Sequence, residues 1–377
     1  MHDVFIVYPV SFLKIMGLSC GIVGLPNAGK STIFNALTSA NALVADYPFT
    51  TIDPNIGIVN IPDERLIKLA EIIKPEKVVP ATLKFVDIAG LVKGASQGEG
   101  LGNRFLAHIR EVDALIHVVR FFDLYSPDVS ESIDPKRDVE IINVELLLAD
   151  LETVEKRIGK IEKVAKSGSK EAQTELSFLE RLKNHIAAGK AARLFSPQGE
   201  AEEKILNELN LLTDKPVLYV GNLEEKDGKE RHIETLKKMA EEEKAQVITI
   251  FGKIESELSE FSEEESKAFL NEMGLTESGL RRLIKAAYEL LDLITFYTTN
   301  GIELRAWTIK RGTKAPKAAG KIHTDFEKGF IKAEVVSYED YVKSGSDAAA
   351  RESGVLRIEG KDYEIQDGDM VYFRFKI

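Results

Sequence analysis

The sequence has little of what marks a secreted or membrane-spanning protein. Its 377 residues include one cysteine, Cys20, which excludes a disulfide framework within the chain and favours a reducing compartment, the cytoplasm. The apolar run in residues 1–15 is broken by a proline and lacks the basic start and small-residue cleavage site of a signal peptide. It is also too short to span a bilayer. We interpret residues 1–15 as an N-terminal extension without a role in the fold, and we expect no membrane partner.

An excess of positive charge is also absent. The chain has 50 basic and 61 acidic side chains and a net charge of −11. A protein that binds nucleic acid over its whole surface would be cationic. The negative net charge therefore argues against this class of protein, although local basic patches are still compatible with it. The length of 377 residues predicts two or three domains with a sizeable core.

The most informative motif that is present is a phosphate loop. Residues 24–31 match the pattern G-x-x-x-x-G-K-S and lie between a predicted buried strand, residues 18–24, and a predicted helix, residues 31–38. In this motif successive backbone N–H groups and the helix N-terminus bind phosphate oxygens. Lys30 would reach the β- and γ-phosphates, and the Ser31 hydroxyl would bind Mg²⁺. The expected nucleotide-binding residues are Asn27, Ala28, Gly29, Lys30, Ser31 and Thr32.

Two further motifs follow in the order of a nucleotide switch. Thr51 lies about twenty residues after Lys30, where a switch threonine binds Mg²⁺ directly and closes over the γ-phosphate, with Thr50 as the neighbouring alternative. A predicted strand at residues 82–87 ends in Asp87, which would hold Mg²⁺ through a water molecule, and Gly90 would donate its N–H to the γ-phosphate. The expected catalytic residues are Lys30, Thr51, Asp87 and Gly90.

The residue after this motif departs from the usual switch. Ras-like enzymes have a water-orienting glutamine where this chain has Leu91, whose apolar side chain cannot orient water. We therefore expect slow hydrolysis that uses another group. Asn27 is a candidate ligand for a helper cation, K⁺, although an asparagine in a loop is commonly a tolerant turn residue. His117, inside the apolar strand 114–119, is expected to be a core residue, as is Cys20.

The rest of the chain contains a predicted helical hairpin and two basic stretches. Residues 139–158 and 171–188 predict an antiparallel helical hairpin with a break at 167–169. Its basic cluster is Lys156, Arg157, Lys160, Lys163, Lys166 and Lys170. A second basic stretch, offset in sequence by Asp325 and Glu327, is Lys310, Arg311, Lys314, Lys317, Lys321, Lys328 and Lys332. Either is commonly a solvated face, but either could bind RNA phosphates.

These motifs together resemble the YchF family of Obg-like ATPases. The resemblance is carried by residues 24–31, 47–51 and 85–103, and by residues 305–309 and 318–331, which are similar to that family's C-terminal TGS domain. It covers residues 16–377. It implies an α/β P-loop NTPase (an Obg-type G domain) with an inserted antiparallel helical hairpin and a C-terminal β-grasp-like TGS domain. A predicted helix at 277–293 leads into strands at 354–359 and 370–375.

The implied domain limits follow the same resemblance. We expect an extension at 1–15, the first part of the G domain at 16–130, the helical insertion at 131–202, the second part of the G domain at 203–293, and the TGS domain at 294–377.

The base-recognition motif is altered. Guanine-specific proteins have Asn-Lys-x-Asp after a buried strand, whereas this chain has Leu223 in place of the lysine and Glu225 in place of the aspartate. The chemistry alone leaves ATP and GTP open. The resemblance implies that ATP is preferred, with Asn222 and the Leu223 backbone contacting adenine. Gly252 would allow close approach to the base, although Phe251 replaces the usual serine of that motif.

The sequence thus predicts a Mg²⁺-dependent, slowly hydrolysing ATPase switch. The resemblance implies a cytoplasmic, monomeric protein that binds ATP and associates with ribosomes or ribosomal RNA through the two basic stretches. Two alternatives stay open: an Obg-type GTPase, and a nucleotide-gated scaffold in which partner binding matters more than turnover.

Overall fold

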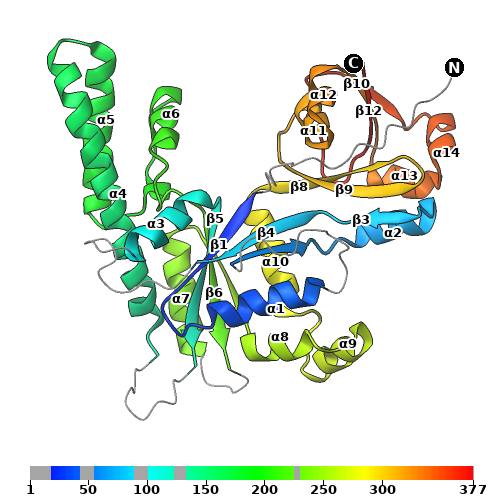
Figure 1. Ribbon diagram of the computed structural model, residues 1–377, viewed down its shortest axis with the longest axis horizontal. Coiled ribbons are helices and arrows are strands. Elements are labelled where there is room, and N and C mark those ends of the chain that lie inside the picture. Colours follow the sequence, from blue (N-terminus) through cyan, green and yellow to red (C-terminus); the bar gives the residue numbers. More distant parts are fainter. Residues whose placement is uncertain (1–17, 43–54, 89–100, 123–132, 225–229, 377) are drawn as a thin grey trace.

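The computed structural model describes residues 18–42, 55–88, 101–122, 133–224 and 230–376 (Figure 1). Among these residues, the named strands form two six-stranded sheets. No described helix is long and apolar enough to cross a bilayer.

The first sheet forms the centre of the nucleotide-binding part. Its order is β2-β4-β1-β5-β6-β7, and its strands are parallel except β2, which is antiparallel to β4. The strands are β1 (Ser19–Val23), β2 (Ile56–Asn60), β4 (Thr82–Asp87), β5 (Ala114–Phe121), β6 (Val217–Leu223) and β7 (Gln246–Ile250). The parallel strands end at one edge, and the phosphate loop leaves the sheet there, after β1.

Helices cover both faces of this sheet, which explains why β1 and β5 are apolar and buried along their length. Helices α1 (Lys30–Ala42) and α10 (Gly279–Leu290) pack on the face that carries Ile22 and Ile116. On the opposite face, which carries Val23 and Leu115, lie α3 (Leu101–Glu111), α4 (Pro135–Lys166) and α7 (Glu230–Glu242). Two shorter helices, α8 (Gly252–Leu258) and α9 (Glu263–Glu272), follow β7.

The inserted helical hairpin projects away from the sheet (Figure 1). It consists of the long α4 and α5 (Lys170–Ala187), with α6 (Glu200–Leu209) beside it after a 3₁₀ turn at Ala192–Leu194. Gly168 has a φ of 96° at the tip, and the Ser169 hydroxyl accepts a hydrogen bond from the Ala172 N–H to start α5. The predicted antiparallel hairpin with its break at 167–169 is confirmed.

The second sheet has the order β11-β10-β12-β8-β9-β3. Strands β8 (Leu293–Thr299) and β9 (Glu303–Lys310) form an antiparallel hairpin, and β12 (Met370–Phe375) is parallel to β8. Strands β10 (Phe330–Val336) and β11 (Arg357–Glu359) complete it. The helices are α11 (Ala315–Ile322), α12 (Thr324–Lys328), α13 (Tyr338–Ser344) and α14 (Asp347–Glu352). A hairpin, a helix packed on the sheet, and a last strand parallel to the first are the features of the predicted β-grasp.

The helix before this sheet is shorter than the predicted range 277–293. Helix α10 ends at Leu290, and Leu293 already belongs to β8. Asp292 adopts a φ of 51°, a left-handed conformation that ends the helical path. The predicted strand at 354–359 is also shorter, because β11 spans Arg357–Glu359 alone.

One strand of the second sheet comes from the first half of the chain. Between β2 and β4 the chain forms α2 (Glu64–Ile73) and β3 (Lys77–Val79), and β3 pairs in parallel with β9. The domain limits implied by the sequence put residues 77–79 in the nucleotide-binding part. Three residues of strand have no periodicity to recognise, so this pairing could not be seen in the sequence.

A polar cluster at the start of α2 joins the two sheets, and we call it the Arg65 junction. The Asp63 carboxylate caps α2 and accepts hydrogen bonds from the Arg65 side chain and from the hydroxyl of Tyr297 in β8. The Arg65 guanidinium also contacts Asp367, with 2.8 Å between Nη1 and Oδ2. Asp367 in turn accepts the N–H of Thr295. Burial and the adjacent Asp63 carboxylate raise the pKa of Tyr297, which therefore remains a neutral donor.

We expect replacement of Arg65 by alanine to lower the free energy of unfolding by about 2–3 kcal/mol, because it leaves the largely buried Asp63 carboxylate without its cation. Arg281→Ala is the matched control. It removes an exposed pair with Glu64 and should cost within about 0.5 kcal/mol. Urea denaturation followed by circular dichroism measures both, and equal losses would contradict a special role of the junction.

Candidate nucleotide-binding site

The phosphate loop has the backbone that its motif requires. Gly29 adopts a φ of 89°, and a Cβ placed on it would lie 2.1 Å from the Asn222 side-chain nitrogen. Both observations exclude larger residues at this position. Asn27 has a φ of 60°, which asparagine tolerates better than most residues. Helix α1 then begins at Lys30, so its free N–H groups point toward the loop.

Lys30 and Ser31 lie where the motif predicts. The Lys30 ammonium is largely buried and donates a hydrogen bond to the Leu25 carbonyl at 2.8 Å. Burial lowers the pKa of Lys30, and the nearby Asp87 carboxylate opposes this shift. The Ser31 hydroxyl donates to the Asp87 carboxylate, with 2.9 Å between Oγ and Oδ2. These residues come together because β1 and β4 pair in parallel, with Ile22 opposite Asp87.

The donor set at this point fits Mg²⁺. The second Asp87 oxygen, Oδ1, is buried and has no hydrogen-bond partner among the described residues, an unusual state for a carboxylate. A carboxylate and a hydroxyl side by side are the hard oxygen donors that Mg²⁺ prefers. The described residues contain no cluster of three His, Cys, Asp or Glu side chains. Mg²⁺ does not require one, since water and phosphate oxygens complete its shell.

Asn222 connects three parts of the site. Its side-chain nitrogen donates to the Ala28 carbonyl in the phosphate loop at 3.0 Å, and its oxygen accepts the Gly252 N–H at the start of α8 at 3.0 Å. The residue is 4% exposed. We call this arrangement the Asn222 clasp. The family resemblance implies that Asn222 contacts adenine. In the clasp, one of the two amide N–H groups of Asn222 has no protein acceptor among the described residues.

Gly252 and Leu223 lie beside this clasp. A Cβ on Gly252 would be 2.7 Å from the Asn222 oxygen, so the glycine permits the contact. Leu223 is the last residue of β6 and is half-buried. Phe122 was missed by the sequence analysis: it follows β5 and is half-buried, and its ring lies 4.0 Å from a Cβ placed on Gly29. Its place just after a parallel strand was the available signal.

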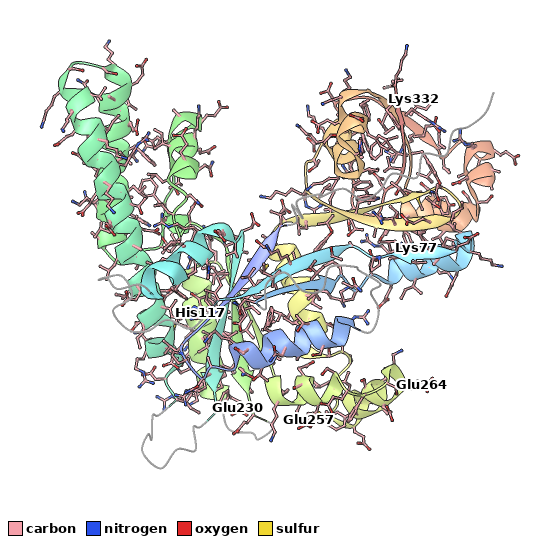
Figure 2. All side chains as sticks on the ribbon, viewed as in Figure 1. Lys77, His117, Glu230, Glu257, Glu264 and Lys332 are labelled. Carbon is pink, nitrogen blue, oxygen red and sulfur yellow. The ribbon has the colours of Figure 1, made fainter. Side chains whose placement is uncertain are left out.

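The remaining predicted residues divide into two groups. Thr50, Thr51, Gly90, Leu91 and Glu225 lie outside the described residues. His117 and Cys20 are buried, as expected of core residues, and His117 packs 5.4 Å from the Tyr219 ring (Figure 2). Burial lowers the pKa of His117 to about 3, so the imidazole is neutral at physiological pH.

The basic stretch of the C-terminal part is less cationic than its sequence suggests. The fold brings Asp292 to Arg311, Asp362 to Lys314, Glu327 to Lys317 and Glu334 to Lys332. The expectation that Asp325 and Glu327 alone offset the stretch is therefore wrong, because carboxylates distant in sequence are folded against it. Among the described residues, Lys310, Lys321 and Lys328 have no ion-pair partner.

The hairpin lysines are neutralised in part by their own helices. Lys156 pairs with Glu152 and Lys166 with Glu162, each one helical turn away. The Arg157 guanidinium contacts Glu175 on α5 at 2.6 Å, so it joins the two helices. The free cations of this cluster, within the described residues, are Lys160, Lys163 and Lys170.

Family models match two parts of the chain. Residues 19–163 match a model described as "50S ribosome-binding GTPase", and residues 293–376 match YchF-GTPase_C, described as "Protein of unknown function". The second match begins at the first residue of β8, where the β-grasp sheet starts.

Relatives named "Ribosome-binding ATPase YchF" match nearly the whole chain. The relative from Bacillus subtilis (strain 168) is 52% identical over 368 residues, which is 96% of this chain and 100% of the relative. The relative from Haemophilus influenzae is 50% identical over 369 residues, with the same shares. The solved Schizosaccharomyces pombe YchF GTPase is 39% identical, spans 95% of this chain and 98% of its own, and has a TM-score of 0.86. The resemblance seen in the motifs is confirmed, and the chain belongs to the YchF family.

Proposed function

We propose that this chain is a Mg²⁺-dependent ATPase that acts as a switch and associates with ribosomes. The single observation that carries the proposal is the Ser31–Asp87 pair beside the phosphate loop, with one buried carboxylate oxygen left for a metal-bound water. The relatives are named ribosome-binding ATPases, and these names support both the association with ribosomes and the preference for ATP. The protein would act in the cytoplasm, where ribosomes are, and we propose that it is a monomer.

Each predicted site residue has a role in this proposal. Lys30 neutralises charge on the β- and γ-phosphates, and Ser31 and Thr51 bind Mg²⁺ directly. Asp87 orients a water of the metal, and Gly90 donates its N–H to the γ-phosphate. The N–H groups of residues 27–32 surround the phosphates. Because Leu91 cannot orient water, catalysis rests on positioning and charge neutralisation, and turnover is slow.

The base lies against the clasp. The Asn222 N–H group without a protein acceptor faces adenine together with the Leu223 backbone, and Gly252 leaves room for the ring. We propose the domain limits that the sequence suggests, 16–130 with 203–293, 131–202 and 294–377, and we add that residues 77–79 complete the C-terminal sheet.

A GTPase is the second candidate, because the solved S. pombe relative and the matching family model carry that word. Calorimetric titration with ATP and GTP distinguishes the two. We expect ATP to bind more tightly, because Leu223 and Glu225 do not reproduce the guanine-reading lysine and aspartate. Comparable affinities would favour the GTPase.

The same titration tests the metal site. We expect Asp87→Asn to weaken Mg²⁺ binding in the nucleotide complex roughly ten- to a hundred-fold, because Asp87 holds a water of the metal. Chelation of Mg²⁺ should then change ATP affinity much less in this variant than in the unaltered protein. Glu234→Gln, an exposed carboxylate on α7, is the control. An unaltered Mg²⁺ dependence in Asp87→Asn would remove Asp87 from the site.

We further propose that K⁺ assists hydrolysis at Asn27, which is exposed in the phosphate loop. Turnover should be faster in potassium than in sodium buffer, because the Asn27 side-chain oxygen holds the larger cation near the β- and γ-phosphates. Asn27→Gly retains the positive φ and removes that oxygen, so it should abolish the difference. Equal turnover of the unaltered protein in both buffers contradicts the proposal.

A ribosome-binding assay tests the role of the three C-terminal lysines that have no carboxylate partner among the described residues. We expect Lys310→Gln, Lys321→Gln and Lys328→Gln together to weaken cosedimentation with ribosomes and to reduce the slope of log K against log salt by about 2–3. The control triple replaces Lys314, Lys317 and Lys332, whose charges are paired within the fold. It removes the same net charge and should have a smaller effect. Equal losses would indicate long-range attraction rather than contact.

A further inference from the structure

A pair of aromatic side chains lies at the surface where α8 leads into α9. The rings of Phe261 and Phe269 meet edge to face with their centroids 6.0 Å apart, and Phe261 is 42% exposed. Together with Ala268, Glu265 and Glu272 they line a shallow pocket of about 300 Å³. Glu265, Ala268 and Glu272 lie at the spacing of one face of α9, and Phe261 precedes that helix. We call this feature the Phe261 pocket.

The core of α8 and α9 uses one of the two rings and leaves the other at the surface. Leu270 of α9 packs with Ile254 and Leu258 of α8, and the half-buried Phe269 packs against the same cluster. The start of α9 is fixed independently by a capping box between Ser262 and Glu265. The exposed ring of Phe261 is therefore additional apolar surface, of the kind that marks an interaction site when polar residues surround it.

The surroundings of the pocket are strongly acidic. Glu257, Glu260, Glu264 and Glu272 are carboxylates without an ion-pair or hydrogen-bond partner among the described residues. Figure 2 labels Glu257 on α8 and Glu264 on α9, at the edge of the molecule. Elsewhere on the surface many exposed acidic side chains are paired, as Glu71 is with Lys68 and Glu152 with Lys156. Unpaired like charges close together repel one another, and a cationic partner would relieve this repulsion.

We propose that the Phe261 pocket docks a basic segment of another protein, rich in lysine or arginine and carrying one apolar anchor side chain. The anchor packs between Phe261, Phe269 and Ala268, and the cations lie along Glu260, Glu264 and Glu272. Charge complementarity selects this occupant. The aromatic rings add to it, because a ring face attracts ammonium and guanidinium groups. Phosphate groups would meet the same carboxylates unfavourably, so this surface selects protein rather than nucleic acid.

The pocket is also connected to the nucleotide site. Helix α8 begins at Gly252, which the Asn222 clasp holds, and its last turn packs Leu258 under α9. A segment bound in the pocket would therefore rest on the helix that follows the base-binding loop. The basic surfaces proposed for ribosomal RNA are on the hairpin and the C-terminal part, so the two kinds of contact use different faces.

The test uses the full chain and a labelled synthetic peptide of sixteen residues. The peptide is helical, its lysines are distributed around the helix, and it has one leucine at its centre. Fluorescence anisotropy measures its affinity at two salt concentrations. A second peptide replaces the leucine with serine, and a third probe is a labelled single-stranded RNA. The protein variants are Phe261→Ser and the pair Glu260→Gln with Glu264→Gln.

Each variant has a matched control. Ile67→Ser removes an equally apolar side chain, 62% exposed on α2. Glu234→Gln with Glu241→Gln removes the same charge from the exposed side of α7. Thermal melting reports folding. If Phe261→Ser does not fold, the serine peptide and the glutamate pair decide the question.

We expect Phe261→Ser and the serine peptide each to weaken binding about ten-fold, which is the scale of one buried apolar anchor. The glutamate pair should weaken binding and reduce its salt dependence, whereas both controls should bind as the unaltered chain does. The proposal is overturned if the leucine peptide does not bind, if the serine peptide binds equally well, or if controls and variants lose affinity alike. It is also overturned if the RNA binds with the same sensitivity to Phe261.

Discussion

The nucleotide site depends on one buried amide. Asn222 donates to the carbonyl of Ala28 and accepts the N–H of Gly252, so the phosphate loop, strand β6 and the start of α8 share a single side chain. Because both ends of the amide have partners, its orientation is determined, and an apolar replacement would leave a buried carbonyl and a buried N–H unsatisfied. Glycines at 29 and 252 are required because any Cβ there would collide with this amide. The geometry of the phosphate loop and the position of the start of α8 are therefore parts of one constraint.

A second connection runs from the site to the C-terminal sheet. Strand β4 ends in Asp87, and its antiparallel neighbour β2 continues through Asp63 into α2 and β3. The Arg65 junction and the β3–β9 pairing then tie this segment to the second sheet. The strand that ends in the Asp87 carboxylate is thus bonded to a strand whose continuation reaches the β-grasp part. This connection consists of backbone pairing and of the ion pairs of Arg65.

Charge behaves differently in the sequence and on the folded surface. The C-terminal basic stretch loses several of its free cations to carboxylates such as Asp292 and Asp362, and the hairpin cluster pairs within its own helices. In contrast, Glu257, Glu260, Glu264 and Glu272 have no ion-pair partner among the described residues, and they lie around the aromatic pair of Phe261 and Phe269. Exposed pairs contribute little stability, but they decide which charges remain available to a partner. The basic and acidic surfaces that can bind a partner are therefore smaller than the composition suggests, and they lie on different elements of the fold.

The sequence by itself determined the phosphate loop, the buried parallel strands and the helical hairpin. These features depend on local patterns, such as glycine spacing, apolar runs and helical periodicity, that identify themselves within a short window. The tertiary structure alone decided the Asn222 clasp, whose partners Asn222 and Ala28 are 194 residues apart. It also decided the place of β3 and the neutralisation of the basic stretch. Such contacts depend on how separate elements pack, and no local pattern encodes which distant carboxylate or strand will be the neighbour.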